Sequence, residues 1–588
     1  MAPKKKKTVK TMDVVAAKSK KKPSSRKAKK PAVSTRSSKP APKPVVIEDD
    51  EILLSEALDE AFPEEEVEEL ERPMSQISDP EIVSKEEIKK EAPIMKDSDT
   101  PKKPFFKNPL KVCSLIIVLA TVVSVGFLIF NISRSNFLPA KIFYPSVFAL
   151  IVLALVILRL TARRKTKAVT HIIIDIFSVI LLAASVFGNF KLDDTITFLD
   201  KNLNGASYQT IVYDVITGKT SKYNSKESLK DSSIIAPPDF ILSEDELINA
   251  VRDQLNANLT FNENNDAVTN LPLNDPDGLI LLGDAIYTSM TEASADYASA
   301  TKIVTTLKIE KRIDKDADNG DIAEKPFMLF LSGIDAREDY MPYASRSDVN
   351  IAIAVNPKTA QILLLTIPRD YQIHVPGTSG GLNDKMTHTG SLGGVQLSKA
   401  TAEELLGVKF DDYARVNFAF VVGLVDAIGG ITINSDWDTP ITCWTNRSCV
   451  IQPGDNNVDG ECALAFARER MAYDTGDTHR AENQQQVIGK IFEKVSKSST
   501  LLGSYSAILD ALDGTFETSL TSSDIQSFVR LQLDKTPSWK IHSYTLATTG
   551  HDELLTYSYP TQPLYVAYQD PASVAKGKQL IQEILNGN

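Results

Sequence analysis

Residues 327–337 read FMLFLSGIDAR and carry the clearest fold signal in this chain. The apolar run at 327–331 has the length and composition of a buried strand. Gly333 allows a tight exit from that strand, and Asp335 and Arg337 follow it directly. Because the C-terminal ends of strands are the usual ligand side of an α/β sheet, we expect a site at this edge.

Two further apolar runs, at 349–355 and 362–367, follow the first one. The turn-forming sequence Asn-Pro-Lys-Thr joins them, which predicts a hairpin. The second run stops at Pro368, Arg369 and Asp370. Acidic and basic side chains therefore gather again at the point where an apolar strand ends.

The next part of the chain predicts a helix at 421–428 with a glycine stop, and then a strand at 431–434. Further on, the sequence Phe-Ala-Arg-Glu-Arg occupies residues 466–470. If that piece is extended, Arg468 and Arg470 point to the same side, since side chains alternate along a strand.

A second helix is expected from about residue 477 to residue 497. Asp477 is well placed as its N-cap. Arg480 and Gln484 are four residues apart and therefore share a face of this helix.

The residues at these strand ends and helix starts suit a phosphate ligand. Arg is the side chain suited to bidentate capture of phosphate oxygens. Asp335 and Asp348 could hold Mg²⁺, which takes oxygen ligands and is often shared with substrate phosphates. Arginines with a carboxylate-bound metal are what phosphoryl transfer needs. The arginines concerned are Arg337, Arg346, Arg369, Arg468, Arg470 and Arg480.

Each of these residues taken alone is more typical of a surface ion pair, since Arg and Asp side chains are mostly exposed. The phosphate-site interpretation depends on several of them falling together at strand ends and helix starts. The sequence contains no P-loop and no Rossmann glycine pattern, so a nucleotide is not indicated. No grouping of His and Cys has the spacing of zinc ligands.

The first 109 residues differ from the rest of the chain in composition. Residues 1–44 hold 14 Lys and 2 Arg against one acid, and residues 48–99 are mainly acidic. Neither block can form a core, so we expect residues 1–109 to be a disordered tail. A lysine block can bind nucleic acid, but the spans that follow favour contact with anionic lipid, and we expect no nucleic-acid partner. The net charge of −11 sums opposite blocks and describes no single surface.

Residues 110–190 predict a membrane anchor, with apolar stretches at 112–132, 143–158 and 171–190. Three such stretches with short polar links favour three membrane-spanning helices over buried core helices. The link at 159–167 carries five basic residues, whereas the link at 133–141 carries two. By the positive-inside rule the N-terminus is cytoplasmic, and everything after residue 190 is extracellular.

The remaining chain is expected to form an accessory domain at 191–324 and a catalytic domain at 325–588. In the accessory domain residues 210–215 predict a strand, and Ser243 with Glu246 predicts a capping box at the start of a helix. The expected result is a small α+β domain in which the sequence indicates no chemistry.

The cysteines of the outer region suggest one disulfide bond. Cys443 and Cys449 flank a short loop and could form a disulfide outside the cell. Cys462 would then be left over, and we expect it to be buried.

A series of short motifs follows one another along residues 325–497. They are Gly333-Ile-Asp335-Ala-Arg337, Arg346-Ser-Asp348, Ile367-Pro-Arg369-Asp370, Val416-Asn-Phe418, Asp426-Ala-Ile-Gly-Gly430, Asp459-Gly-Glu-Cys-Ala-Leu464, Ala467-Arg-Glu-Arg470, and Gly476-Asp477 with Arg480 and Asn483-Gln484-Gln485. Taken in this order, they resemble the LytR–CpsA–Psr family of Gram-positive cell-wall ligases. The remainder of the last domain matches by position only. The three-span anchor with an extracellular accessory domain is similar to the capsule-attaching branch of that family.

The resemblance implies an α/β catalytic domain with a mixed central sheet flanked by helices. It also implies a membrane-anchored enzyme that transfers a phosphate-linked glycopolymer, such as capsule or teichoic acid, from a polyprenyl-pyrophosphate carrier to peptidoglycan. The enzyme would depend on Mg²⁺, would work at the outer face of the cell membrane, and could also hydrolyse polyprenyl pyrophosphate.

The resemblance further implies roles for individual residues. Asp335 and Asp348 would hold Mg²⁺, and an apolar groove under the sheet would take the lipid chain. The catalytic arginines would be Arg369, Arg468 and Arg470. The resemblance does not say which residue activates the acceptor hydroxyl, and Asp348 or Asp370 could serve. The pyrophosphate would be bound by Arg337, Arg346, Arg369, Arg468, Arg470, Arg480 and Gln484.

A different class of function remains open, namely a regulator or scaffold that senses an envelope lipid without ligase activity. The sequence also departs from the family pattern at three positions. Thr366 stands where a Ser is common, Asn483 stands where many members have Arg, and Glu482 adds a negative charge. None of these changes removes an expected ligand, but they leave the preferred polymer undecided.

Overall fold

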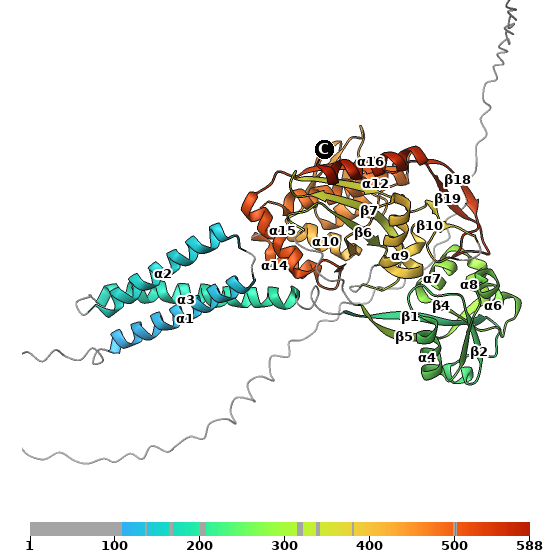
Figure 1. The fold of residues 1–588 in the computed structure, drawn as a ribbon, viewed down its shortest axis with the longest axis horizontal. Coiled ribbons are helices and arrows are strands. Elements are labelled where there is room, and N and C mark those ends of the chain that lie inside the picture. Colours follow the sequence, from blue (N-terminus) through green and yellow to red (C-terminus); the bar gives the residue numbers. More distant parts are fainter. Residues whose placement is uncertain are drawn as a thin grey trace, which may run out of the picture. The chain divides into compact units, whose positions relative to one another are not determined.

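The computed structural model describes residues 109–135, 138–163, 168–199, 207–313, 322–336, 341–378, 381–497, 500 and 503–587 (Figure 1). The charged tail lies outside these ranges except for its last residue, so its disorder stays a prediction. Arg337, one of the expected phosphate ligands, also lies outside the described residues.

In the described part of the chain, three helices are long and apolar enough to cross a membrane. Each begins before and ends after the apolar stretch that predicted it, since helical hydrogen bonding continues into the flanking polar residues. The predicted three-helix anchor is therefore confirmed as a structural feature. The helices are α1 (Pro109–Ser135), α2 (Ala140–Ala162) and α3 (Ala168–Leu199).

Polar side chains join α1 to α3. The Ser114 hydroxyl donates a hydrogen bond to Asp175 at 2.6 Å, and the Asn131 amide donates one to Asn189 at 2.9 Å. Within a bilayer such pairs satisfy polar groups that have no water partner. The two helices are thereby held in one register.

The accessory domain is built on a sheet with strand order β3-β2-β4-β1-β5 among the described residues. The predicted capping box is present, because the Ser243 hydroxyl accepts from the Glu246 N–H and the Glu246 carboxylate accepts from the Ser243 N–H. The strands are β1 (Ser207–Gly218), β2 (Ser233–Ala236), β3 (Asn258–Phe261), β4 (Ile280–Gly283) and β5 (Thr301–Ile313). The helices are η3 (Lys226–Leu229), α4 (Glu244–Leu255), α5 (Asn265–Thr269), α6 (Leu271–Asn274), α7 (Asp284–Ala293) and α8 (Ala295–Ala300).

The following domain contains a mixed sheet with strand order β16-β11-β6-β7-β8-β17 among the described residues. β11 pairs with β6 and β17 pairs with β8 in parallel, while the other neighbours are antiparallel. The predicted hairpin is confirmed as β7 and β8. The strands are β6 (Phe327–Ile334), β7 (Ser347–Asn356), β8 (Gln361–Thr366), β11 (Asp412–Val416), β16 (Phe516–Thr518) and β17 (Lys540–Thr545).

Helices cover both faces of this sheet. On β8, Leu363 and Leu365 belong to the core formed with α9 (His388–Leu406) and α16 (Pro571–Asn586). Ile362 and Leu364 face the opposite side, in the core formed with α12 (Asp477–Val495) and α15 (Ser522–Lys535). A strand buried on both faces has no polar alternation, which explains its continuous apolar sequence.

The expected helix at 421–428 is present as α10 (Phe418–Ala427). Residues 466–470 are not an extended segment, so the condition under which Arg468 and Arg470 would share a side is not met. Residues up to Ala467 instead form α11 (Gly460–Ala467). The Asp459 side chain caps this helix by accepting the Cys462 N–H at 2.9 Å. Alanines at three of its eight positions favour a helix over a strand. Arg468 is the C-cap, so it and Arg470 do not occupy strand positions.

The remaining elements are short. They are β9 (Gln372–Ile373), β10 (Asp384–Lys385), β12 (Ile431–Ser435), β13 (Ile441–Thr442), β14 (Val450–Ile451), β15 (Gly454–Val458), α14 (Tyr505–Leu512), β18 (Thr548–Leu554) and β19 (Leu564–Gln569).

Candidate functional site

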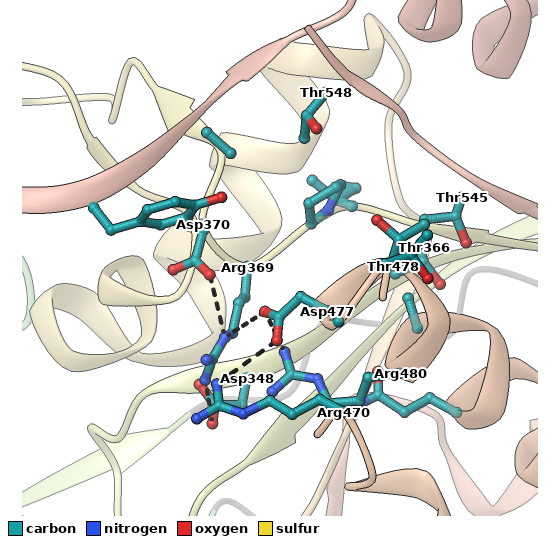
Figure 2. Close-up of a pocket in the computed structure, with 18 of the residues that line it drawn as sticks. Asp348, Thr366, Arg369, Asp370, Arg470, Asp477, Thr478, Arg480, Thr545 and Thr548 are labelled. Atoms are coloured by element: carbon teal, nitrogen blue, oxygen red, sulfur yellow. Dashed lines mark hydrogen bonds and ion pairs between the residues drawn. The ribbon is translucent and has the colours of Figure 1, made fainter. Parts of the chain in front are cut away.

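Arg369 lies just past the end of β8, where the apolar run stops. Its guanidinium group contacts three carboxylates: Asp348 at 3.2 Å, Asp477 at 3.1 Å and Asp370 at 3.5 Å. Figure 2 shows these side chains pointing toward one another from β7, from the segment after β8 and from the start of α12. Residues far apart in the sequence thus form one charged cluster.

Asp477 joins three guanidinium groups. Besides Arg369, its carboxylate contacts Arg480 at 3.0 Å and Arg470 at 3.7 Å. The expectation that Asp477 caps α12 was wrong, because the N-cap is Gly476 with a φ of +52° and Asp477 is the first helical residue. The left-handed turn at Gly476 suits glycine, and the carboxylate that follows it faces the arginines.

The cluster changes the acidity of its members. Burial would raise the pKa of Asp348, but the guanidinium groups of Arg369 and Arg480 bring that pKa below its usual value. The pKa of Asp370 is lowered in the same way, against burial, by Lys385 and Arg369. Burial and the neighbouring Arg369 lower the pKa of Arg480. Both carboxylates are therefore ionised at neutral pH.

Two cavities meet at this cluster. One has a volume of about 630 Å³ and is lined largely by charged and hydroxyl side chains, several of which are labelled in Figure 2. The other has a volume of about 490 Å³ and is lined mainly by apolar side chains of β6, β11, α10 and α12. We call them the polar cavity and the apolar cavity. The residues that line both are Asp348, Arg369, Arg470, Arg480 and Gln484.

The apolar cavity is followed by a further one. A third cavity of about 280 Å³ lies between the sheet and helices α12 and α15, and it has no polar lining residue. Ile488 and Phe492, four residues apart on α12, line both it and the apolar cavity. One face of α12 therefore runs from Arg480 and Gln484 at the charged cluster to apolar side chains within the two apolar spaces.

Asp335 and Asp348, the expected Mg²⁺ ligands, both line the apolar cavity near the arginines. Asp348 accepts a hydrogen bond from the Thr387 hydroxyl at 3.0 Å, and Asp335 lies 3.6 Å from Arg346. Among the described residues, no group of three or more His, Cys, Asp or Glu side chains could hold a metal. Two carboxylates still fit Mg²⁺, because this ion commonly takes its other ligands from water and substrate phosphates.

The other expected phosphate ligands do not all lie in the wall that the polar and apolar cavities share. Arg468 lines only the apolar cavity, with its guanidinium 4.3 Å from the centre of the Phe418 ring. Arg346 lines none of these cavities and instead pairs with Glu292 of α7 at 3.1 Å. Arg369, Arg470, Arg480 and Gln484 are brought together, as described above.

Sequence reasoning missed three polar residues that organise the site. Lys385 on β10 pairs with Asp370 at 2.5 Å, and Thr387 binds Asp348. Glu469 is 1% exposed and accepts backbone N–H groups of the loops around it, including that of Met471 at 2.7 Å. Glu469 lies between two arginines in the sequence, which was the one available signal. The partners of Lys385 and Thr387 depend on tertiary contacts alone.

The expected pairing of Cys443 with Cys449 was wrong. Cys449 is bonded to Cys462, and Cys443 is a buried free thiol. Cys462 lies on α11, which packs against the loop that carries Cys449, and this contact cannot be read from loop length.

Comparison with known proteins places this domain in a family. The model of the family described as LytR_cpsA_psr matches residues 287–569. The matched segment contains the whole charged cluster, the residues that line the polar cavity, and Cys443, Cys449 and Cys462.

Two curated relatives illustrate the extent of the similarity. A protein of Enterococcus faecalis named polyisoprenyl-teichoic acid–peptidoglycan teichoic acid transferase TagU is 31% identical over 228 residues, which is 39% of this chain and 71% of the relative. Biofilm regulatory protein A of Streptococcus mutans is 30% identical over 206 residues, which is 34% of this chain and 50% of the relative. The chain thus spans only half the length of the second relative.

A solved structure described as TagT bound to LIIa-WTA is 26% identical to the chain. The match covers 46% of this chain and 95% of that structure, with a TM-score of 0.37.

Proposed function

Because the chain belongs to the LytR_cpsA_psr family, we propose that it is a membrane-anchored phosphotransferase of the cell wall. Its donor would be a glycopolymer, such as capsule or teichoic acid, linked through pyrophosphate to a polyprenyl carrier, and its acceptor would be peptidoglycan. The E. faecalis relative is named as a transferase of this kind. The observation that carries the proposal is the cluster of arginines and carboxylates in the wall shared by a polar and an apolar cavity.

The donor has three chemically different parts, and the site offers a matching environment for each. The pyrophosphate suits the arginines of the shared wall, since guanidinium groups bind phosphate oxygens in pairs. The polyprenyl chain suits the apolar cavity and the third cavity beyond Ile488 and Phe492. The sugar suits the polar cavity, where Thr478, Thr545 and Thr548 supply hydroxyl groups.

The transfer requires one bond to form and one to break. The acceptor hydroxyl oxygen attacks the phosphorus that carries the glycopolymer, and the bond from that phosphorus to the bridging oxygen breaks. The bridging oxygen leaves as part of polyprenyl phosphate, where Arg369 and Arg480 neutralise its charge. Asp348 or Asp370 takes the hydroxyl proton, since both are ionised at neutral pH and line the polar cavity.

Mg²⁺ would be held by Asp335 and Asp348. When bound, it would add charge neutralisation at the phosphates. Arg369 contacts Asp348 directly, so it would orient that carboxylate as well as binding the donor.

The anchor determines where the reaction takes place. The basic link between the second and third spans, followed by one more span, assigns the tail to the cytoplasm and both folded domains to the outside. Both the lipid-linked donor and peptidoglycan would be accessible there.

The test is turnover of a polyprenyl-pyrophosphate donor by the full-length protein in lipid nanodiscs with Mg²⁺. Arg369→Ala should lower turnover by about 100-fold or more, since it removes a donor to the charged phosphates. Arg252→Ala is the matched control, because Arg252 lies on α4 and its bond is to Asn249 of the same helix. Equal turnover by the two variants would show that the proposed cluster is not the site.

A regulator or scaffold that senses an envelope lipid is the second candidate, and the name of the S. mutans relative is the observation that favours it. Deleting residues 1–100 separates the two functions. Attachment of polymer to the wall should persist if the chain is a ligase, and Asp348→Ala should abolish it in the same strain.

A further inference from the structure

The sulfur atom of Cys449 lies close to the sulfur atoms of both Cys443 and Cys462. Cys449 is bonded to Cys462, with 5.2 Å between their Cα atoms. The Cys443 sulfur lies 3.6 Å from the Cys449 sulfur, and the Cys443 side chain is buried. Cys449 therefore has a second cysteine within contact distance.

The backbone already suits the alternative pair. β13 and β14 are antiparallel, with Ile441 opposite Ile451 and Thr442 opposite Val450. Continuing this register places residues 443 and 449 opposite each other, and the Cys443 N–H donates to the Cys449 carbonyl at 3.0 Å. Opposed residues of an antiparallel pair have Cα atoms about 4.5–5.5 Å apart, which is within the range that a disulfide spans.

We propose that Cys443 exchanges with the Cys449–Cys462 disulfide, and that this exchange releases the segment bearing Arg468 and Arg470. The Cys443 thiolate attacks the Cys449 sulfur, the bond from Cys449 to Cys462 breaks, and a bond from Cys443 to Cys449 forms. Cys462 leaves as a thiolate and takes up the proton that Cys443 gave up. One disulfide replaces another, so the step needs neither an oxidant nor a reductant.

The two disulfides hold different parts of the structure. The Cys449–Cys462 bond ties the β13–β14 hairpin to α11, whose C-terminal end leads directly into Arg468. A Cys443–Cys449 bond would lie within the hairpin and would leave α11 without a covalent link to the hairpin.

Noncovalent contacts then have to hold the arginine segment by themselves. The Trp444 N–H donates to Glu469 at 2.7 Å, and the Trp444 ring N–H donates to the Arg468 carbonyl at 3.1 Å. The Arg470 guanidinium lies 5.8 Å from the centre of the Trp444 ring. Since Trp444 directly follows Cys443, the exchange acts on the residue that contacts both arginines.

Burial keeps the exchange slow in the folded protein. Burial and the nearby Glu469 carboxylate raise the pKa of the Cys443 thiol to about 12, so the attacking thiolate is scarce at neutral pH. The exchange thus needs a local opening of the hairpin or a catalytic thiol from outside.

The test uses full-length protein in detergent and maps disulfides by differential alkylation and mass spectrometry. Wild type should show Cys443 as the free outer thiol and, after incubation with a trace of glutathione, should gain a fraction with Cys462 free. Cys462→Ala should form the Cys443–Cys449 bond in an oxidising glutathione buffer, and Cys443→Ala should keep Cys449–Cys462. A folded Cys462→Ala protein that retains two free thiols in the outer region would overturn the proposal.

Hydrogen exchange tests the effect on the arginine segment. The amides of Met471 and Ala472, which bind Glu469, should exchange several-fold faster in Cys462→Ala than in Cys443→Ala. Equal protection in the two variants would show that the segment is not released. Any effect of the exchange on turnover rests on the proposed function. Binding of inorganic pyrophosphate to Cys443→Ala tests the proposed function, whereas the disulfide mapping tests the exchange.

Discussion

The Asp477 carboxylate contacts three guanidinium groups. A bound pyrophosphate would offer the same arginines more charge and more oxygen atoms than one carboxylate does. If the proposed donor binds here, Asp477 would both organise the cluster and compete with the donor. Asn483, which departs from the family pattern, has a different role: its amide donates to the Phe466 carbonyl and to the Tyr473 hydroxyl inside the core.

Asp477→Asn should separate the two roles of this carboxylate. We expect the free energy of unfolding to fall by about 1–2 kcal/mol, because Arg369, Arg470 and Arg480 each lose one carboxylate contact while Arg369 keeps those with Asp348 and Asp370. Affinity for inorganic pyrophosphate, measured by calorimetry, should rise by about 5-fold because the competing charge is gone. Asp474→Asn is the control, since Asp474 lines the same cavity and forms no ion pair with the arginines of the described chain. Weaker binding by Asp477→Asn would contradict this assignment.

Asp214 of β1 gives the accessory domain a pH-dependent stability. Burial and the charge of Asp284 raise the pKa of Asp214 to about 6, although the Thr306 hydroxyl donates to it. The folded state then binds more protons than the unfolded state between about pH 4 and pH 6, so stability falls as the pH rises through that window. In urea denaturation, the free energy of unfolding of Asp214→Asn should fall across this pH window by about 1 kcal/mol less than that of wild type. The control Asp245→Asn, at an exposed position, should show the same fall as wild type. An unchanged slope in Asp214→Asn would refute the raised pKa.

Helix α12 connects the charged cluster of the site to its apolar cavities. Its first turns carry Asp477, Arg480 and Gln484, and its later turns carry Ile488 and Phe492. At 1.5 Å per residue, the distance from Arg480 to Phe492 along the axis is about 18 Å. A rigid helix can therefore hold the phosphate end and the lipid end of a donor at a set separation.

The start of α12 depends on Gly476. An alanine there would have to adopt a left-handed conformation, which costs about 1–2 kcal/mol, although no atom lies within 4 Å of the added Cβ. Gly476→Ala should lower the melting temperature and the donor turnover together, because Asp477 would move from the arginines.

Gly489→Ala is the matched control in the same helix. Its Cβ would meet Ile541 at 3.9 Å, an ordinary contact, and alanine has the higher helix propensity. This variant should be as stable as wild type or more stable by about 1 kcal/mol in chemical denaturation. Stability loss in both variants would argue against a conformational cause at Gly476.

The whole molecule combines three apolar helices with a charged cluster that lies in the wall shared by a polar and an apolar cavity. The three apolar helices were predictable because a run of about 20 apolar residues has few other stable environments. The orientation of the anchor is a prediction from loop charge alone.

Replacing the basic residues between 159 and 167 with Asn should disturb this orientation. We expect external protease to digest the outer domains of wild type in intact cells, and a protected fraction to appear in the variant. The same number of Lys→Asn changes within residues 1–30 is the control for total charge. Full protection of wild type from external protease would reverse the assigned topology.

Three strands of the sheet, β6, β7 and β8, and the helices α10 and α12 could be predicted, because local apolar runs, turns and glycine stops encode them. The strand order could not be predicted, since pairing of β11 with β6 and of β17 with β8 joins distant segments. The same limit applied to the site. The arginines were visible as residue types at strand ends, but the role of Asp477 was mistaken for a cap because Asp is common at helix starts.

The sequence by itself determined the three apolar helices, the buried strands and the supply of arginines and carboxylates, because each depends on residues close together in the chain. Only the tertiary structure decided which arginines share a carboxylate, that Arg346 pairs with Glu292, and that Cys449 bonds to Cys462 rather than to Cys443. These outcomes depend on which elements pack against one another. That packing is set by burial summed over the whole domain, which no local pattern contains.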